Sequence, residues 1–326
     1  MPLGLQQLSR YSMFDEITSK ENFLTAFNNT RKGQCKHKIE AIKFYDNWPS
    51  NLEVVRKDVI NQTYTVSPYT EFKVFEPKER AIKAPKYRDK IVQHAINNVL
   101  RDFYEPRFIK DSYACIRGKG THRALAALRD HASRACEYMD DPHFIKMDVS
   151  KFFYSIHHDT LKSVVRKKIQ CQQTLRLLDI IIESSGAVGL PLGNLTSQVL
   201  ANVYMNELDQ YAKHTLKLKH YVRYADDFFA VVDGRNTAVA VKNKLKEFVV
   251  GSLKLRIADP KCGITRVRKG VVALGMKVHP SHIALISKHK RSAIKLARKG
   301  NATAINSWKS FASSANCHKF CKSIGI

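Results

Sequence analysis

Residues 221–234 read Tyr-Val-Arg-Tyr-Ala-Asp-Asp-Phe-Phe-Ala-Val-Val-Asp-Gly, two short apolar runs separated by a pair of adjacent carboxylates. The runs are rich in Val, Tyr and Phe, which favour strands, while Ala225-Asp226-Asp227 has the short polar character of a tight connection. We therefore expect a β-hairpin that carries Asp226 and Asp227 at its tip.

A second hydrophobic strand that ends in an acid is expected at 144–148, where Phe-Ile-Lys-Met precedes Asp148. Hard divalent cations take oxygen ligands, and Mg²⁺ in proteins is typically held by one or two carboxylates together with substrate phosphates. Asp148, Asp226 and Asp227 could hold two metal ions about 3.5–4 Å apart, a clamp for the attacking and leaving oxygens of nucleotidyl transfer. The plainer alternative is that the acidic pair caps a hairpin and that Asp148 begins a helix.

The charge balance points to a polyanionic partner. Lys and Arg number 55 against 29 Asp and Glu, a formal net charge of +26, and no acidic residue follows Asp259. Such an excess favours nucleic acid over other partners. At 326 residues, 44% of them hydrophobic, the chain can bury a large core.

Neither a membrane nor an oxidising compartment is expected. No stretch approaches the roughly 18 apolar residues of a spanning helix, and the residues after Met1 lack the pattern of a signal peptide. The seven cysteines are scattered and odd in number, which suits reduced thiols in a cytoplasm. Cys317, His318 and Cys321 have a spacing that could suit zinc, but no second pair accompanies them.

Three segments could approach a phosphate or a ligand. Residues 72–85 form two alternating runs around Pro-Lys-Glu, which predicts a hairpin with Lys78 and Arg80 near its tip. The tip could fold so that these side chains contact a triphosphate, or the side chains could lie in solvent. Residues 115–122 form a basic loop without the spacing of a P-loop, and residues 189–198 form a loop whose glycines permit close backbone approach.

Hydrophobic periodicity predicts the remaining elements. We expect helices near Phe23–Phe27, at 51–61, at Tyr87–Tyr104, at Ala124–His131, at Thr160–Ile169, at Val199–Ala212 and at Ala238–Phe248, and strands at Leu253–Ile257 and Val271–Val278.

In their order along the chain these motifs resemble the reverse transcriptases, over about residues 50–280. Residues 80–93 and 112–118 look like fingers motifs of group II intron, retron and related bacterial enzymes, and Tyr224-Ala225-Asp226-Asp227 is similar to the family's Y-x-D-D box. The resemblance implies an α/β (α+β) right-hand polymerase. Its parts would be an N-terminal extension (1–69), fingers (70–145), an antiparallel palm sheet backed by helices (146–280) and a short basic helical thumb (281–326).

The resemblance also implies roles for single residues. Asp148, Asp226 and Asp227, with the Val149 carbonyl, would bind two Mg²⁺ ions, with Mn²⁺ as a possible substitute. Lys78 and Arg80 would contact the triphosphate, and Phe153 would exclude a ribose 2′-hydroxyl. Lys261 would contact the leaving pyrophosphate, and Arg117 would contact the template or the nucleotide. Leu274-Gly275 would form the primer grip, next to an Ala273 that replaces the usual aromatic residue.

The loop at 189–198 departs from most reverse transcriptases, which carry Gln before the second glycine and Pro after the serine. Here Leu192 precedes Gly193 in the nucleotide-binding loop, and Gln198 follows Ser197 on the template and primer side. This form resembles the reverse transcriptases of diversity-generating retroelements, which copy a template-repeat RNA inaccurately at adenines to diversify a target gene.

The resemblance implies several partners for a cytoplasmic enzyme encoded by a bacterium or a phage. They are a template RNA and its RNA/cDNA duplex, deoxynucleoside triphosphates, and a small, basic, oligomeric accessory protein. Two alternatives stay open: a retron or other group II-like reverse transcriptase of ordinary fidelity, and a polymerase-like RNA-binding protein without catalysis.

Overall fold

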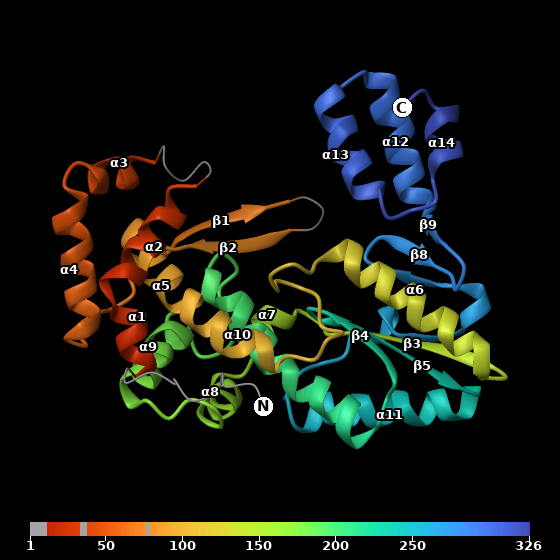
Figure 1. Cartoon of the computed structure of the whole chain (residues 1–326), viewed down its shortest axis with the longest axis horizontal. Helices are drawn as coiled ribbons and strands as arrows, with labels where there is room; N and C mark the ends of the chain where they lie inside the picture. The colour runs from red at the N-terminus through yellow and green to blue at the C-terminus, as the bar shows by residue number, and fades with distance from the viewer. Residues whose placement is uncertain (1–11, 33–37, 76–78) are drawn as a thin grey trace, which may run out of the picture. The chain divides into compact units, whose positions relative to one another are not determined.

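The computed structural model describes residues 12–32, 38–75 and 79–326 (Figure 1). The chain divides into two compact units, one within residues 1–107 and 151–204 and the other formed by residues 108–150 and 205–326. Each unit thus contains two separate stretches of sequence. The expected division into four consecutive domains stays a prediction.

The first unit is mostly helical. Its N-terminal helices are α1 (Met13–Thr18), α2 (Lys20–Thr30), α3 (Ile39–Tyr45) and α4 (Trp48–Ile60), followed by the hairpin β1 (Thr70–Val74) and β2 (Arg80–Ala84), by α5 (Tyr87–Tyr104) and by the 3-10 turn η2 (Glu105–Arg107). The apolar face of α2 packs on α5, with Phe23, Phe27 and Ile91 at most 1% exposed. The helices α2, α4 and α5 and the hairpin confirm the predictions from sequence, whereas α1 and α3 were not predicted.

The rest of this unit consists of short helices. They are α7 (Phe152–Ser155), α8 (His158–Arg166), α9 (Gln172–Glu183) and the first part of α10 (Leu195–Gln210), which runs on into the π-helical turn η3 (Tyr211–Thr215). The sequence did not predict α9, although buried leucines and isoleucines follow one of its faces. No helix among the described residues is long and apolar enough to cross a membrane.

The second unit is built on an antiparallel sheet with the strand order β4-β5-β3-β6. Its strands are β3 (Pro142–Asp148), β4 (His220–Tyr224), β5 (Asp227–Asp233) and β6 (Gly263–Arg266). In Figure 1, α6 (Thr121–Tyr138) and α11 (Arg235–Gly251) lie on opposite sides of this sheet. Antiparallel strands with helices packed on them are the palm architecture that the sequence predicts.

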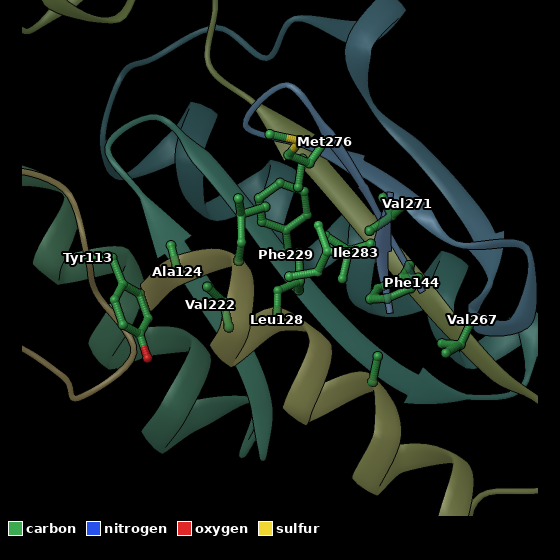
Figure 2. Packing of buried hydrophobic residues seen from close by; sticks show 14 of the residues in the cluster. Tyr113, Ala124, Leu128, Phe144, Val222, Phe229, Val267, Val271, Met276 and Ile283 are labelled. Atoms are coloured by element: carbon green, nitrogen blue, oxygen red, sulfur yellow. The ribbon is translucent and has the colours of Figure 1, made fainter. Parts of the chain in front are cut away.

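Alternation along the strands places one set of apolar side chains under α6. Phe144, Val222 and Phe229 belong to a buried cluster that also includes Leu128 of α6 (Figure 2). Because side chains of a strand alternate between the two faces, Asp148 and Asp227 lie on this same face, at the end of the sheet. The hydrophobic cluster therefore anchors the strands that carry the acids.

A small sheet and three helices complete the second unit. The sheet contains β7 (Val271–Ala273), β8 (Met276–Val278) and β9 (Ile283–Leu285), and η5 (Val267–Lys269) precedes it. The helices α12 (Ser287–Lys299), α13 (Ala302–Ala312) and α14 (His318–Ser323) form the basic helical segment that the sequence predicts at the C-terminus.

Two strand predictions were wrong. Residues 271–278 form a hairpin instead of one strand, because Leu274 and Gly275 adopt positive φ values of 48° and 82° and turn the chain. Residues 253–257 form an irregular segment in which Lys254 has a φ of 53° and Leu255 donates its amide hydrogen to the Val249 carbonyl. Leu255 is nevertheless buried, so the apolar alternation reflects core packing without a strand.

Candidate active site

The acidic pair lies at the turn between β4 and β5. Tyr224 pairs with Asp227, which leaves Ala225 and Asp226 as a two-residue turn. On the neighbouring strand Asp148 pairs directly with Asp227, at the last position of β3. The sheet thus brings the three predicted acids to one end, although Asp148 is separated from the other two by more than 70 residues of sequence.

Lys261 binds the carboxylate of Asp148. Its Nζ lies 2.6 and 2.7 Å from the two oxygens of a side chain that is itself 8% exposed. The hydrogen bond to Asp148 raises the pKa of Lys261 above its ordinary value, against the opposing effect of burial. Lys261 ends the 3-10 turn η4 (Asp259–Lys261), just before β6.

Asp227 resists ionisation. Burial, followed by the negative charges of Asp148 and Asp226, raises the pKa of Asp227 to about 7, and Lys146 opposes this effect in part. A carboxyl group whose pKa is raised by neighbouring acids lies where added positive charge is most strongly stabilised.

The donor set fits a hard divalent cation, although no three acidic, His or Cys side chains in the described part of the chain already form a ligand group. Asp148, Asp226 and Asp227 lie at the same end of the sheet, and the Asp148 oxygens contact the ammonium of Lys261. The Ser150 amide donates to the Arg256 carbonyl, and the Ala258 amide donates to the Asp148 carbonyl. The Val149 carbonyl lies between these two bonds and takes part in neither. These oxygens are the type of ligand that Mg²⁺ and Mn²⁺ prefer.

A basic loop borders the Y-x-D-D turn in the same unit. Thr121, at the start of α6, donates a hydrogen bond of 3.0 Å to the hydroxyl of Tyr224. Just before it, the Lys119 ammonium donates to the carbonyls of Lys110 and Ser112 at 2.6 and 2.8 Å. Arg117 is exposed in this loop.

The loop of residues 189–194 is held to two elements of the first unit. The Lys83 amide on β2 donates to the Leu192 carbonyl at 2.8 Å, and the Leu190 amide donates to the Phe153 carbonyl on α7 at 2.7 Å. Gly193 lies so close to β2 that a Cβ atom would stand 2.4 Å from the Lys83 carbonyl oxygen. The structure therefore brings Phe153, Leu192 and Gly193 together beside the β1–β2 hairpin.

The other predicted residues of this unit are more dispersed. Arg80 is exposed at the start of β2, and Gln198 is exposed on the first turn of α10. Lys78 falls outside the described residues.

The predicted primer grip is the turn of the β7–β8 hairpin. A Cβ atom at Gly275 would lie 3.0 Å from Nε2 of His289 on α12 and 3.3 Å from Cζ of Phe311 on α13. The turn of Leu274 and Gly275 therefore packs against the C-terminal helices.

Sequence reasoning missed a buried ion pair between Asp209 and Arg223. Both side chains are 0% exposed, and the guanidinium Nη2 lies 2.7 Å from a carboxylate oxygen. The signal in the sequence was an arginine within an apolar strand, two residues before Ala225, because a charged residue in such a strand can be buried with an acidic partner.

Comparisons with known proteins assign the chain to a family. The profile of the reverse transcriptase (RNA-dependent DNA polymerase) family matches residues 73–278, more than half of the sequence. The chain therefore belongs to the reverse transcriptases, the RNA-directed DNA polymerases, and the right-hand polymerase fold is confirmed.

Its relatives include bacterial and intron-encoded proteins. It is 26% identical to protein YkfC of Escherichia coli (strain K12) over 70% of this chain and 71% of that protein. It is 22% identical to the group II intron-encoded protein LtrA of Lactococcus lactis subsp. cremoris, over 62% of this chain and 44% of LtrA. The chain thus spans most of YkfC but less than half of LtrA.

Solved structures show the same fold at low identity. Apo telomerase of Candida tropicalis, truncated from its C-terminal domain, superposes with a TM-score of 0.53 at 10% identity over 72% of this chain and 59% of that one. Telomerase of Candida albicans in complex with a fragment of telomeric RNA superposes with a TM-score of 0.53 at 11% identity, over 85% of this chain and 59% of that one.

Proposed function

We propose that this reverse transcriptase serves a diversity-generating retroelement in the cytoplasm of a bacterium or a phage-infected cell. It would copy a template-repeat RNA into cDNA that carries errors at adenines, and this cDNA would diversify a target gene by mutagenic retrohoming. The observation that carries the proposal is the pair formed by Leu192, in the loop before α10, and Gln198, on the first turn of α10.

The chemistry of Leu192 supports low fidelity. A polar side chain in a nucleotide pocket penalises a misplaced nucleotide by about 1–3 kcal/mol for each buried group left unpaired. An apolar side chain discriminates by shape alone, roughly 10–200-fold for one methylene. Leu192 is partly buried, and its backbone is fixed to β2 by the hydrogen bond from Lys83, so its side chain is held in one place without offering a polar contact.

In the proposed mechanism Asp148, Asp226 and Asp227, with the Val149 carbonyl, hold two divalent cations, Mg²⁺ by preference. Bound there, the cations would stabilise the charge that develops on the attacking and leaving oxygens. Lys261 orients Asp148 through its two hydrogen bonds and carries a proton that it could supply to the leaving pyrophosphate. Lys146 adds positive charge beside Asp227.

The remaining residues would select and hold substrates. Phe153 would exclude a ribose 2′-hydroxyl and thereby select deoxynucleoside triphosphates, which Lys78, Arg80 and Gly193 would bind. We assign Arg117 and Gln198 to the template and the Leu274-Gly275 turn to the primer of an RNA/cDNA duplex. A small, basic, oligomeric accessory protein completes the proposed complex.

Sequencing of cDNA tests the assignment. The enzyme would copy an RNA containing all four bases, with Mg²⁺ and the accessory protein, as wild type, Leu192→Gln and Leu195→Gln. Leu195 is a matched control, since it begins α10 directly after this loop and is also partly buried. The proposal is supported if the errors opposite adenine become less frequent in Leu192→Gln and stay as frequent as in wild type in Leu195→Gln. Uniformly accurate wild-type cDNA would instead indicate a group II-like enzyme of ordinary fidelity.

Asp226→Asn separates catalysis from RNA binding alone. Because Asp226 is a proposed metal ligand, we expect the variant to lose synthesis while it retains its affinity for RNA in a filter-binding assay. A wild-type protein that binds RNA but extends no primer in Mg²⁺ or Mn²⁺ would favour the non-catalytic alternative.

A further inference from the structure

A fully buried polar cluster lies next to the catalytic turn. Arg223 on β4 donates through Nε to both carboxylate oxygens of Asp209, at 2.8 and 2.9 Å, and through Nη2 at 2.7 Å. The hydroxyl of Tyr221 donates to the same carboxylate at 3.0 Å. Burial disfavours the charged form of Arg223, but Asp209 outweighs this effect and the pKa of Arg223 lies above its ordinary value.

This cluster lies on the face of the sheet opposite to the acids. Tyr221 and Arg223 alternate with Val222 and Tyr224 along β4, and Tyr224 pairs with Asp227. Since side chains of a strand alternate between faces, Arg223 points away from the face that carries Asp148 and Asp227. Arg223 is attracted by the charge of Asp226, and any influence on the direction of the Asp226 side chain passes through the turn itself.

One hydrogen bond makes this connection. Nη1 of Arg223 donates to the Ala225 carbonyl at 3.1 Å. Ala225 has a φ of 53°, a conformation in which glycine is the usual residue of a two-residue hairpin turn. The Ala225 carbonyl belongs to the same peptide plane as the Asp226 amide, so the bond fixes the plane from which the Asp226 side chain projects.

The backbone of Arg223 is held as well. Its amide donates to the Asp111 carbonyl at 2.9 Å, and its carbonyl accepts from the Tyr113 amide at 3.0 Å. With the side chain bound to Asp209 and the main chain bound to residues 111–113, the guanidinium has a fixed position from which to hold the turn.

We propose that Arg223, oriented by Asp209, is a positioning residue that sets the direction of Asp226 in the metal-binding turn. The proposal rests on the function proposed above for Asp226 and Asp227. A buried ion pair is often replaceable by apolar residues without loss of stability, so fold stability alone gives no reason for this pair. A fork-shaped guanidinium that reaches both Asp209 and the Ala225 carbonyl gives a geometric one.

The test uses a neutral double variant, Arg223→Met with Asp209→Leu. It removes one positive and one negative charge together, so that the net charge of the protein stays unchanged. Leu245→Ala is the control, because Leu245 is buried on α11 in the same unit and its truncation lowers stability away from the turn. The readouts are thermal unfolding, Mn²⁺ binding by electron paramagnetic resonance without primer or nucleotide, and single-turnover nucleotide incorporation.

We expect the double variant to unfold near the wild-type temperature but to bind Mn²⁺ and to incorporate nucleotide about 10–100-fold less well, the range seen when groups that orient metal ligands are removed. Leu245→Ala should unfold earlier with wild-type Mn²⁺ affinity. Wild-type Mn²⁺ affinity and rate in the double variant would overturn the proposal.

Arg223→Lys repeats the test if the double variant does not fold. A lysine keeps the charge but lacks the fork, so we expect weaker Mn²⁺ binding, and a fully active, fully binding Arg223→Lys would equally overturn the proposal. A wild-type protein that neither binds Mn²⁺ nor extends a primer would contradict the proposed function and not the positioning role.

Discussion

Gly193 and Gly186 both adopt backbone conformations that favour glycine, with φ values of 129° and 119°. Their surroundings differ. A Cβ atom at Gly193 would lie 2.4 Å from the Lys83 carbonyl oxygen, whereas one at Gly186 would meet no atom within 4 Å. Backbone strain is thus common to both positions, and steric overlap belongs to Gly193 alone.

We therefore expect Gly193→Ala to lower the free energy of unfolding by about 1–3 kcal/mol more than Gly186→Ala, the usual cost of overpacking. Urea unfolding followed by circular dichroism measures the difference. Equal losses in the two variants would show that the loop moves away from β2 at no cost.

His220, the first residue of β4, is buried beside two other titratable side chains. Its Nε2 lies 2.6 Å from the Tyr138 hydroxyl, and its Nδ1 lies 3.0 Å from Nδ1 of His131. Burial, followed by the positive charges of His131, Lys213, Arg134 and Lys219, lowers the pKa of His220 to about 4. The neutral ring is therefore the form that the folded chain stabilises.

Stability should depend on pH through this residue. The folded pKa lies below the ordinary value of 6.5, so the contribution of His220 is complete above that pH and is lost as the pH falls toward 4. We expect His220→Asn to reduce the slope of unfolding free energy against pH in this window by up to about one proton. The exposed His214, replaced in the same way, should leave the slope unchanged.

At the scale of elements, Lys119 fixes a segment that extends the palm sheet. Its ammonium binds the carbonyls of Lys110 and Ser112, and residues 111–113 in turn pair with Arg223 of β4. A single lysine thus stabilises the edge strand that leads into the turn of Ala225 and Asp226.

Lys119→Met should remove the donor to both carbonyls, at a cost of about 1–3 kcal/mol for the one that belongs to the buried Ser112. We expect faster hydrogen exchange at the amides of Tyr113 and Arg223, measured by mass spectrometry on peptic fragments. Lys110→Met removes an exposed lysine from the same segment and serves as the control. If hydrogen exchange in Lys119→Met were unchanged, strand pairing alone would be sufficient to hold this segment in place.

At the scale of the whole molecule, the formal charge of +26 should govern affinity for nucleic acid. If binding neutralises phosphates, the logarithm of affinity falls with the logarithm of salt concentration by about 0.7–0.9 per phosphate contact. Arg291 and Lys295 are exposed on α12, in the part of the sequence without acidic residues.

We expect Arg291→Gln with Lys295→Gln to reduce the magnitude of that slope by about 1–2 for an RNA–DNA duplex, measured by fluorescence anisotropy over a KCl series. Lys244→Gln removes an exposed charge from α11 and should change the slope less. If Lys244→Gln reduced the magnitude of the slope as much as the double variant, the whole charge of the protein would attract the duplex without a local contact by α12.

The sequence alone was sufficient for the β4–β5 hairpin and for α5 over its full length, because alternation and helical periodicity are local patterns. The antiparallel palm followed from the resemblance to reverse transcriptases. The same patterns misled at residues 253–257, where Leu255 is buried without belonging to a strand, and at Leu274, where a leucine adopts a positive φ that its type does not favour.

Only the tertiary structure decided which distant residues meet. The sequence identified Asp148, Asp226 and Asp227 as candidates through their type and their place at strand ends. The strand register that pairs Asp148 with Asp227, the ammonium of Lys261 on Asp148 and the guanidinium of Arg223 on the Ala225 carbonyl depend on long-range packing. Local propensity specifies where a strand begins and ends, whereas burial against neighbouring elements determines which of its side chains face each other.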